Sequence, residues 1–115
     1  MSNPLPIENL EAFDVVGVRK DGGIDLVVSC AGPLDASPET LSALRTKIAN
    51  YLYEISEARN PTLRESFNCS PTAEIRIIVS CDFPVDPLAL DVVEEMKKAA
   101  QASGVEVLWW AEAGV

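Results

Sequence analysis

The residues of this chain that could do chemistry gather behind two similar stretches, each of which ends in Ser-Cys. Ser29-Cys30 and Ser80-Cys81 are followed by the acidic residues Asp35, Asp82 and Asp86. A serine nucleophile needs a neighbouring base, most often histidine, and the chain contains no histidine. Neither serine lies in a G-x-S-x-G turn, and the sequence cannot place two carboxylates face to face. We therefore expect no enzyme activity and no catalytic residue.

The cysteines are odd in number and include no C-x-x-C pair: Cys30, Cys69 and Cys81. Because histidine is absent, the chain also lacks the commonest metal ligand. We interpret Cys30 and Cys81 as reduced thiols buried in the core of a cytosolic protein, with a metal or redox pair as the alternative. No cofactor and no metal are expected.

Both Ser-Cys stretches belong to an internal repeat of a strand, a turn and the start of a helix. Ile24–Asp35 matches Ile75–Asp86 at six of twelve positions, and three more positions exchange one apolar residue for another. Apolar alternation predicts a strand in each copy. Ser37-Pro38 and Asp86-Pro87 then combine a capping side chain with a proline that suits the first helical turn. The repeat predicts parallel strands with both helix N-termini at one sheet edge.

A ligand site at that edge is the second hypothesis. Open α/β sheets bind ligands beyond the carboxyl ends of their strands, and helix N-termini favour anions. Asp35 and Asp82 oppose an anion, Asp86 is better explained as a helix cap, and neither turn is a glycine-rich phosphate loop. The alternative function is thus a small-molecule-binding or regulatory domain that uses the edge near Cys30, Cys81 and Asp82.

Length, composition and charge limit the number of domains, the partners and the location that we expect for this chain. The chain has 115 residues, 48% of them hydrophobic, which is enough for one domain with a sizeable core. A net charge of −9 argues against nucleic-acid binding, with acidic mimicry of DNA as the remaining alternative. No segment resembles a signal peptide or a membrane span, so a cytoplasmic protein is expected. We expect a loose N-terminal arm over 1–12, a single α+β domain over 13–112 and a C-terminal tail over 113–115.

Hydrophobic periodicity predicts the element order ββαβαβ. The expected strands and helices are Phe13–Arg19, Ile24–Cys30, Pro38–Arg59, Glu74–Cys81, Pro87–Ser103 and Val105–Ala111. A two-residue turn, at Asp21-Gly22 or Gly22-Gly23, joins the first two strands. The inward stripe of the second helix is expected to contain Leu90, Val93, Met96 and Ala100. Because crossovers are right-handed, the fold class is a two-layer α+β sandwich: a four-stranded mixed sheet, order 1-2-3-4, with two helices on one face.

The second face of that sheet has no helix left to cover it. Alternation places six apolar side chains at its centre: Val16, Val18, Val27, Ile78, Leu108 and Trp110. The expected charged rim consists of Lys20, Asp25, Glu74, Arg76, Glu106 and Glu112. Trp109 then points toward the helices.

An apolar centre with a tryptophan and a charged rim is typical of a protein interface. The alternative is that residues 62–71 or the N-terminal arm cover this face. We expect a small non-catalytic interaction protein, either a homodimer or the partner of another bacterial protein.

One helix segment resembles a known family. Lys47-Ile48-Ala49-Asn50-Tyr51-Leu52, which follows a leucine-rich helix start and precedes Glu57, is similar to the helix of a family of small bacterial proteins described only as a domain of unknown function. The family's ββαβαβ plan corresponds to about Phe13 to Ala111, whereas Ser29-Cys30-Ala31-Gly32 replaces a more polar turn. The resemblance implies a bacterial origin and the same architecture, and it implies no activity, cofactor or site.

Overall fold

The computed structural model describes residues 7, 14–56 and 63–110, where strands and helices follow the predicted order. The elements are β1 (Val15–Val18), β2 (Ile24–Ser29), α1 (Pro38–Ile55), α2 (Leu63–Ser66), β3 (Ile75–Ser80), α3 (Pro87–Gln101) and β4 (Glu106–Trp109). The predicted strand ends at Phe13 and Ala111 lie outside the described residues. The single-turn helix α2 lies in the connector between α1 and β3 and has no counterpart among the predicted elements.

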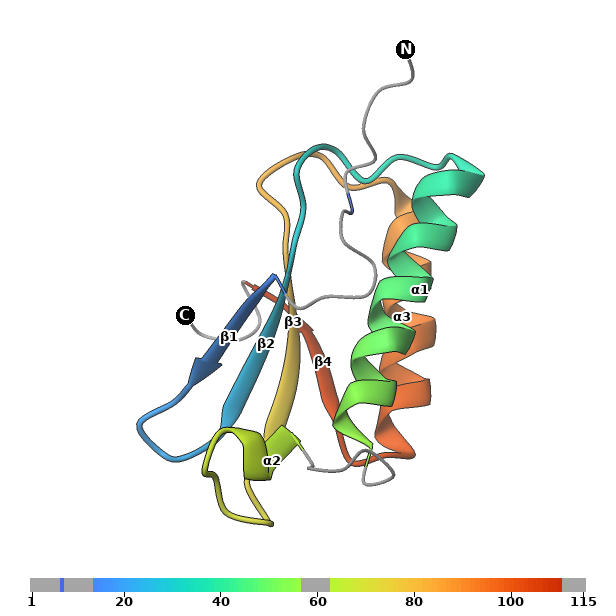
Figure 1. Cartoon of the computed structure of the whole chain (residues 1–115). Helices are drawn as coiled ribbons and strands as arrows, with labels where there is room; N and C mark the ends of the chain where they lie inside the picture. The colour runs from blue at the N-terminus through green and yellow to red at the C-terminus, as the bar shows by residue number, and fades with distance from the viewer. Residues whose placement is uncertain (1–6, 8–13, 57–62, 111–115) are drawn as a thin grey trace.

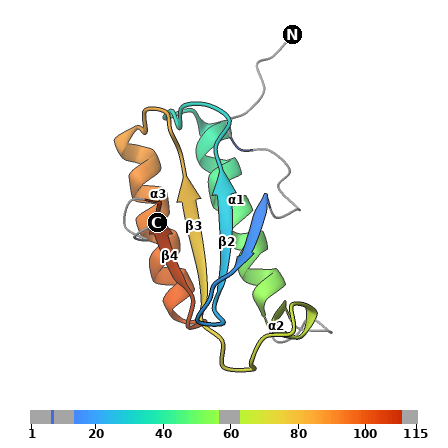
Figure 2. The ribbon, with the colours of Figure 1, turned by 90° about the vertical axis from the view of Figure 1, so that its left-hand side faces the viewer.

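The strands form one mixed sheet in the order β1-β2-β3-β4, as predicted. β1 is antiparallel to β2, whereas β2, β3 and β4 run parallel. The long helices α1 and α3 cover one face of the sheet (Figure 1), and a view onto the sheet shows both helices behind it (Figure 2). These features confirm the two-layer α+β fold. The repeat lies in register, because Ile24 pairs with Ile75 and Ser29 with Ser80.

Both long helices begin as the repeat predicts. Ser37 Oγ accepts a hydrogen bond from the Thr40 amide at 3.2 Å, and Asp86 Oδ1 accepts one from the Leu88 amide at 2.9 Å. Each cap is followed by a proline in the first turn, where a missing N–H group leaves no helical bond unmade.

Both helices end earlier than predicted. α1 ends at Ile55 instead of Arg59, because Ser56 adopts an extended conformation with ψ 149°. The remaining predicted positions, 57–59, lie outside the described residues. α3 ends at Gln101 instead of Ser103, and Gly104, with φ +69°, supplies the predicted left-handed stop.

The hydrophobic core lies between the sheet and the long helices. α3 contributes Ala89, Val92, Val93, Met96 and Ala100. Leu90, predicted to point inward, is exposed because the buried stripe of α3 is centred about one residue away. Ile7 also belongs to the core, so this residue of the expected loose arm is anchored. Trp109 packs against the core from β4, on the helix side as predicted.

β1 faces the opposite way from the prediction. Val16 lies opposite Leu26 and Val18 opposite Ile24, and opposed residues share one face of a sheet. Since Leu26 and Ile24 are buried beneath the helices, Val16 and Val18 also point to the helix side, and their assignment to the helix-free face is wrong.

The cause of this reversal is the length of the hairpin loop. The Arg19 amide donates to the Gly23 carbonyl at 2.8 Å, and the Gly22 amide donates to the Arg19 carbonyl at 2.9 Å. These bonds close a loop of three residues, with Gly22 at φ +90°, instead of the two residues expected. One additional loop residue shifts the register by one and reverses the facing of every side chain in the strand.

Candidate functional site

The candidate site is the sheet face turned away from α1 and α3, which we call the outer face. The register places two rows of side chains across it. The apolar row contains Val15, Val27, Ile78 and Leu108. The charged row contains Asp25, Arg76 and Glu106, next to Gly17. The register places the predicted residues Val27, Ile78 and Leu108 on the outer face, and Val15 takes the place of Val16 and Val18. Alternation one residue past β4, where the Trp110 amide donates to the Val79 carbonyl, adds the predicted Trp110.

Exposed apolar surface on the outer face is concentrated at its two edges. Val15 on β1 is 53% exposed, and Trp110, directly after β4, is 46% exposed. Val27 and Leu108 are half-buried. Ile78, which lies between them in the row, is 1% exposed and contributes packing instead of surface. The apolar centre is consequently narrower than the sequence predicts.

The charged side chains of the outer face form ion pairs with one another. Arg76 donates from Nε and Nη2 to Asp25 Oδ1 and Oδ2, both at 2.8 Å, which is a bidentate ion pair. The hydrogen bonds that Arg76 donates to Asp25 raise the pKa of Arg76 above its ordinary value. Arg19 joins this group, with Nη2 at 3.2 Å from Glu74 Oε1 and Nε at 3.4 Å from Asp25 Oδ1. The outer face therefore presents a fixed polar row beside its apolar row.

The acids at the carboxyl edge of the parallel strands serve the helix starts. Asp86 Oδ1 caps α3, and Asp35 Oδ1 accepts the Ser37 amide at 3.0 Å, just before α1. The hydrogen bonds from Ser37 lower the pKa of Asp35. Asp82 is exposed. The interpretation of Asp86 as a helix cap is confirmed.

The two repeated cysteines meet at this same edge. Cys30 and Cys81 directly follow the paired residues Ser29 and Ser80, and the Cys30 amide donates to the Ser80 carbonyl at 2.9 Å. Both side chains are half-buried and pack against the core, so they are less buried than predicted. Burial, the Cys81 thiol and nearby carboxylates raise the pKa of Cys30 above its ordinary value. Within the described ranges, no three His, Cys, Asp or Glu side chains are grouped to hold a metal ion.

A buried ion pair joins α1 to Asp14, the residue directly before β1, and the sequence pattern does not predict it. Lys47 is 0% exposed, and its Nζ lies 2.7 Å from Asp14 Oδ1. Asp14 Oδ2 accepts the Ser29 amide at 2.8 Å, and the Asp14 amide donates to Tyr51 Oη at 3.0 Å. Tyr51 Oη in turn donates to the Val27 carbonyl at 3.0 Å. The network ties the start of β1 to β2 and α1, which is a structural role.

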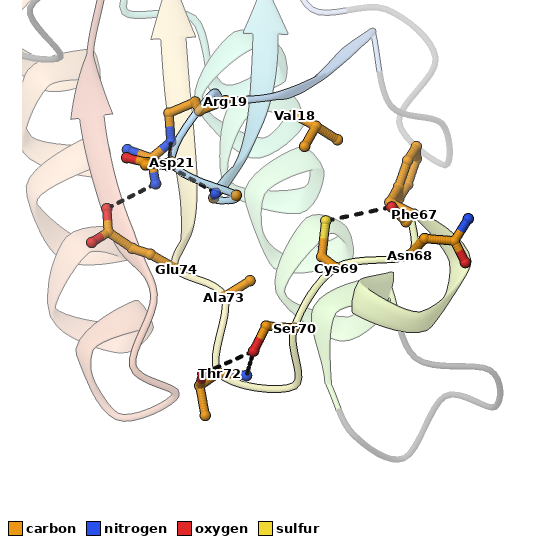
Figure 3. A pocket seen from close by; sticks show the side chains of 12 residues that line it. Val18, Arg19, Asp21, Phe67, Asn68, Cys69, Ser70, Thr72, Ala73 and Glu74 are labelled. Atoms are coloured by element: carbon orange, nitrogen blue, oxygen red, sulfur yellow. Dashed lines mark hydrogen bonds and ion pairs between the residues drawn. The ribbon is translucent and has the colours of Figure 1, made fainter.

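An open hollow of about 640 Å³ lies at the opposite end of the parallel strands (Figure 3). It is bounded by the β1–β2 hairpin and by residues 67–74, with Val18, Phe67 and Cys69 among its lining side chains. Arg19, at its edge, is engaged by Asp21, Asp25 and Glu74, so no positive charge is left uncompensated for an anionic ligand. Leu63 of the same connector is buried in the core on the helix side, away from the outer face.

Comparisons with protein-family models, with curated proteins and with solved structures found no match. Among the helices that the structure describes, none has both the length and the apolar character needed to cross a membrane.

Proposed function

We propose that this chain is a small non-catalytic interaction protein of the bacterial cytoplasm that associates with a second copy of itself through the outer face. The observation that carries the proposal is Trp110, 46% exposed on a helix-free sheet face that also exposes Val15. Tryptophan is among the residue types that contribute most to binding energy at protein interfaces. Neither nucleic acid nor a membrane is a proposed partner.

The distribution of charge favours a second copy over a differently charged partner. Among the described residues, the outer face carries two arginines, Arg19 and Arg76, against three carboxylates, Asp25, Glu74 and Glu106. This face is thus close to neutral, whereas the whole chain carries −9. Two copies repel each other least where they meet through their most neutral surface.

The arrangement of the charged row is also self-complementary. A two-fold axis that runs along the strands between β2 and β3 exchanges the places of those two strands in the facing copy. Asp25 of one copy then lies over Arg76 of the other, because the two residues are level in the register. The strands of the facing sheets are nearly aligned in this arrangement, as in most sheet-on-sheet packings.

The size of the outer face indicates weak association. Four strands spaced about 4.8 Å apart give a face roughly 20 Å wide. Two such faces bury less than the roughly 1,600 Å² of a standard stable interface. We therefore expect a dimer that forms and dissociates in the micromolar concentration range.

Exchanging the charges of Asp25 and Arg76 tests whether the partner that binds the outer face is a second copy of the chain. We expect the mass measured by analytical ultracentrifugation to rise with protein concentration for the wild type. Arg76→Asp places like charges opposite each other and should leave a monomer. Asp25→Arg combined with Arg76→Asp preserves the pair both within and between chains, so it should restore association. Circular dichroism checks that each variant is folded.

A wild-type chain that stays monomeric at all concentrations would overturn self-association. So would a double exchange that dissociates as completely as Arg76→Asp alone, because a second copy carries the compensating exchange and a different partner does not.

A small-molecule-binding or regulatory site at the carboxyl edge is the second candidate, favoured by the adjacent half-buried thiols of Cys30 and Cys81. Its test is a thermal-shift screen against metabolites and soft metal ions, run beside light scattering. A ligand-dependent rise in melting temperature at monomeric mass, lost in Cys81→Ser, supports it. The absence of any such ligand removes it.

A further inference from the structure

The pair of thiols at the carboxyl edge lies on the opposite side of the sheet from the outer face. Ser29 pairs with Ser80, and the ladder continues for one residue, since the Cys30 amide donates to the Ser80 carbonyl at 2.9 Å. Cys30 and Cys81 are therefore level on neighbouring parallel strands. Alternation from the buried residues Val28 and Val79 turns both side chains to the helix side.

The spacing of the two backbone positions falls within the range of bridged cysteines. Neighbouring strands lie about 4.8 Å apart, whereas bridged cysteines have Cα atoms about 4.4–6.8 Å apart. Cys81 Sγ is directed back toward the Cys30 turn, at 3.8 Å from the Gly32 carbonyl oxygen. Both side chains are half-buried, so a small reagent can reach them.

We propose that Cys30 and Cys81 form a reversible intramolecular disulfide, which makes the carboxyl edge a thiol-modification site for low-molecular-weight disulfides such as oxidised glutathione. In the first step, a protein thiolate attacks one sulfur of the reagent, its S–S bond breaks, and one reagent thiol leaves. In the second step, the other protein thiolate attacks the mixed disulfide and releases the second reagent thiol. Two protein thiols are oxidised and one reagent disulfide is reduced to two thiols.

The surroundings of the two sulfurs affect both steps. Burial, the neighbouring Cys81 thiol and the carboxylates Asp14 and Asp82 raise the pKa of Cys30. Either thiol can attack the reagent first, and the other then resolves the mixed disulfide. Bridges whose geometry is constrained by neighbouring strands are more easily reduced than relaxed structural disulfides, which suits a reversible modification.

The bond would join the two turns that lead into α1 and α3. These turns already meet at one point, where the Leu34 amide donates to the Pro84 carbonyl at 3.0 Å and the Asp86 amide donates to the Leu34 carbonyl at 2.8 Å. A covalent link between Cys30 and Cys81 closes a long loop of chain and should raise the melting temperature of the oxidised protein.

The test uses the full chain with Cys69→Ser, which removes the third thiol. After incubation with oxidised glutathione under native conditions, we expect intact mass to show the loss of two hydrogens and alkylation to find no free thiol. Dithiothreitol should restore both thiols. Adding Cys30→Ser or Cys81→Ser should leave one thiol that stops at the glutathione adduct.

Two free thiols after oxidation, stable double glutathione adducts, or bridges only between chains would each overturn the proposal. The same experiment on Trp110→Asp in the Cys69→Ser chain separates this site from the outer face. The bridge is expected to form equally well there, so failure of self-association leaves the disulfide prediction unaffected.

Discussion

Lys47 is fully buried on α1, with its Nζ at 2.7 Å from Asp14 Oδ1 and 5.7 Å from the ring centroid of Tyr51. Lysine is almost never fully buried unless it is paired, so the residue type alone predicts a solvated position. Its partner Asp14 is 33 residues away, and this separation explains why helical periodicity misses the pair. The ion pair with Lys47 holds Asp14 in place directly before β1.

Replacing Lys47 by Met should lower the free energy of unfolding by about 2–4 kcal/mol, because it leaves the Asp14 carboxylate without its cationic partner. The measurement is urea unfolding followed by circular dichroism. Lys98→Met, on the exposed side of α3, is the matched control and should change stability by less than about 0.5 kcal/mol. Equal effects of the two substitutions would show that the buried pair has no special role.

Tyr51 gives stability a dependence on alkaline pH. Burial raises its pKa from 10.0 to about 12. The folded state therefore holds the phenolic proton more tightly than the unfolded state, so this contribution is complete below pH 10 and is lost as the pH rises to about 12. Unfolding curves measured across this window should fall less steeply with pH for Tyr51→Phe than for wild type. Parallel pH profiles would contradict this assignment.

At the scale of elements, one additional residue in the hairpin loop determines which face of the sheet each β1 side chain occupies. The two-residue loop Asp21-Gly22 and the observed three-residue loop over residues 20–22 end in the same glycine, so the residue types do not discriminate between them. The three-residue loop turns Val16 and Val18 to the helix side of the sheet and brings Val15 to the outer face. The helix starts were predictable because Ser37-Pro38 and Asp86-Pro87 carry local signals, whereas the hairpin register depends on a choice between two turns.

Gly22→Ala should destabilise the chain by about 1 kcal/mol, because Gly22 has φ +90°, where a Cβ atom is strained. Gly17 is the matched control: it lies in β1, and a Cβ added there meets no atom within 4 Å. Gly17→Ala should leave the midpoint of thermal unfolding unchanged or slightly raised. If Gly22→Ala melts at the same temperature as wild type, the left-handed loop position is not required.

At the scale of the whole molecule, the repeat made the fold predictable. Two strand-turn-helix units with the same apolar alternation fix a parallel pair, and the right-handed crossover then gives the order 1-2-3-4. The candidate surface was only partly predictable. Alternation along β3 and β4 places Ile78, Leu108 and Trp110 on the outer face, but it does not reveal that Ile78 is 1% exposed. Burial depends on all neighbours of a side chain, whereas alternation records only its direction.

The neighbouring tryptophans at the end of β4 and directly after it provide separate tests of folding and of association. Trp109 packs against the core, whereas Trp110 is 46% exposed on the outer face. Trp109→Asp should therefore lower the unfolding midpoint strongly, because it places a charge beside the helices. Trp110→Asp should leave the fold intact.

Sedimentation velocity over a concentration series of wild type and Trp110→Asp tests the proposed interface most directly. We predict that the wild-type sedimentation coefficient rises with concentration, while that of Trp110→Asp, folded by circular dichroism, stays at the monomer value. The contradicting result is a folded Trp110→Asp chain that associates with the same concentration dependence as wild type.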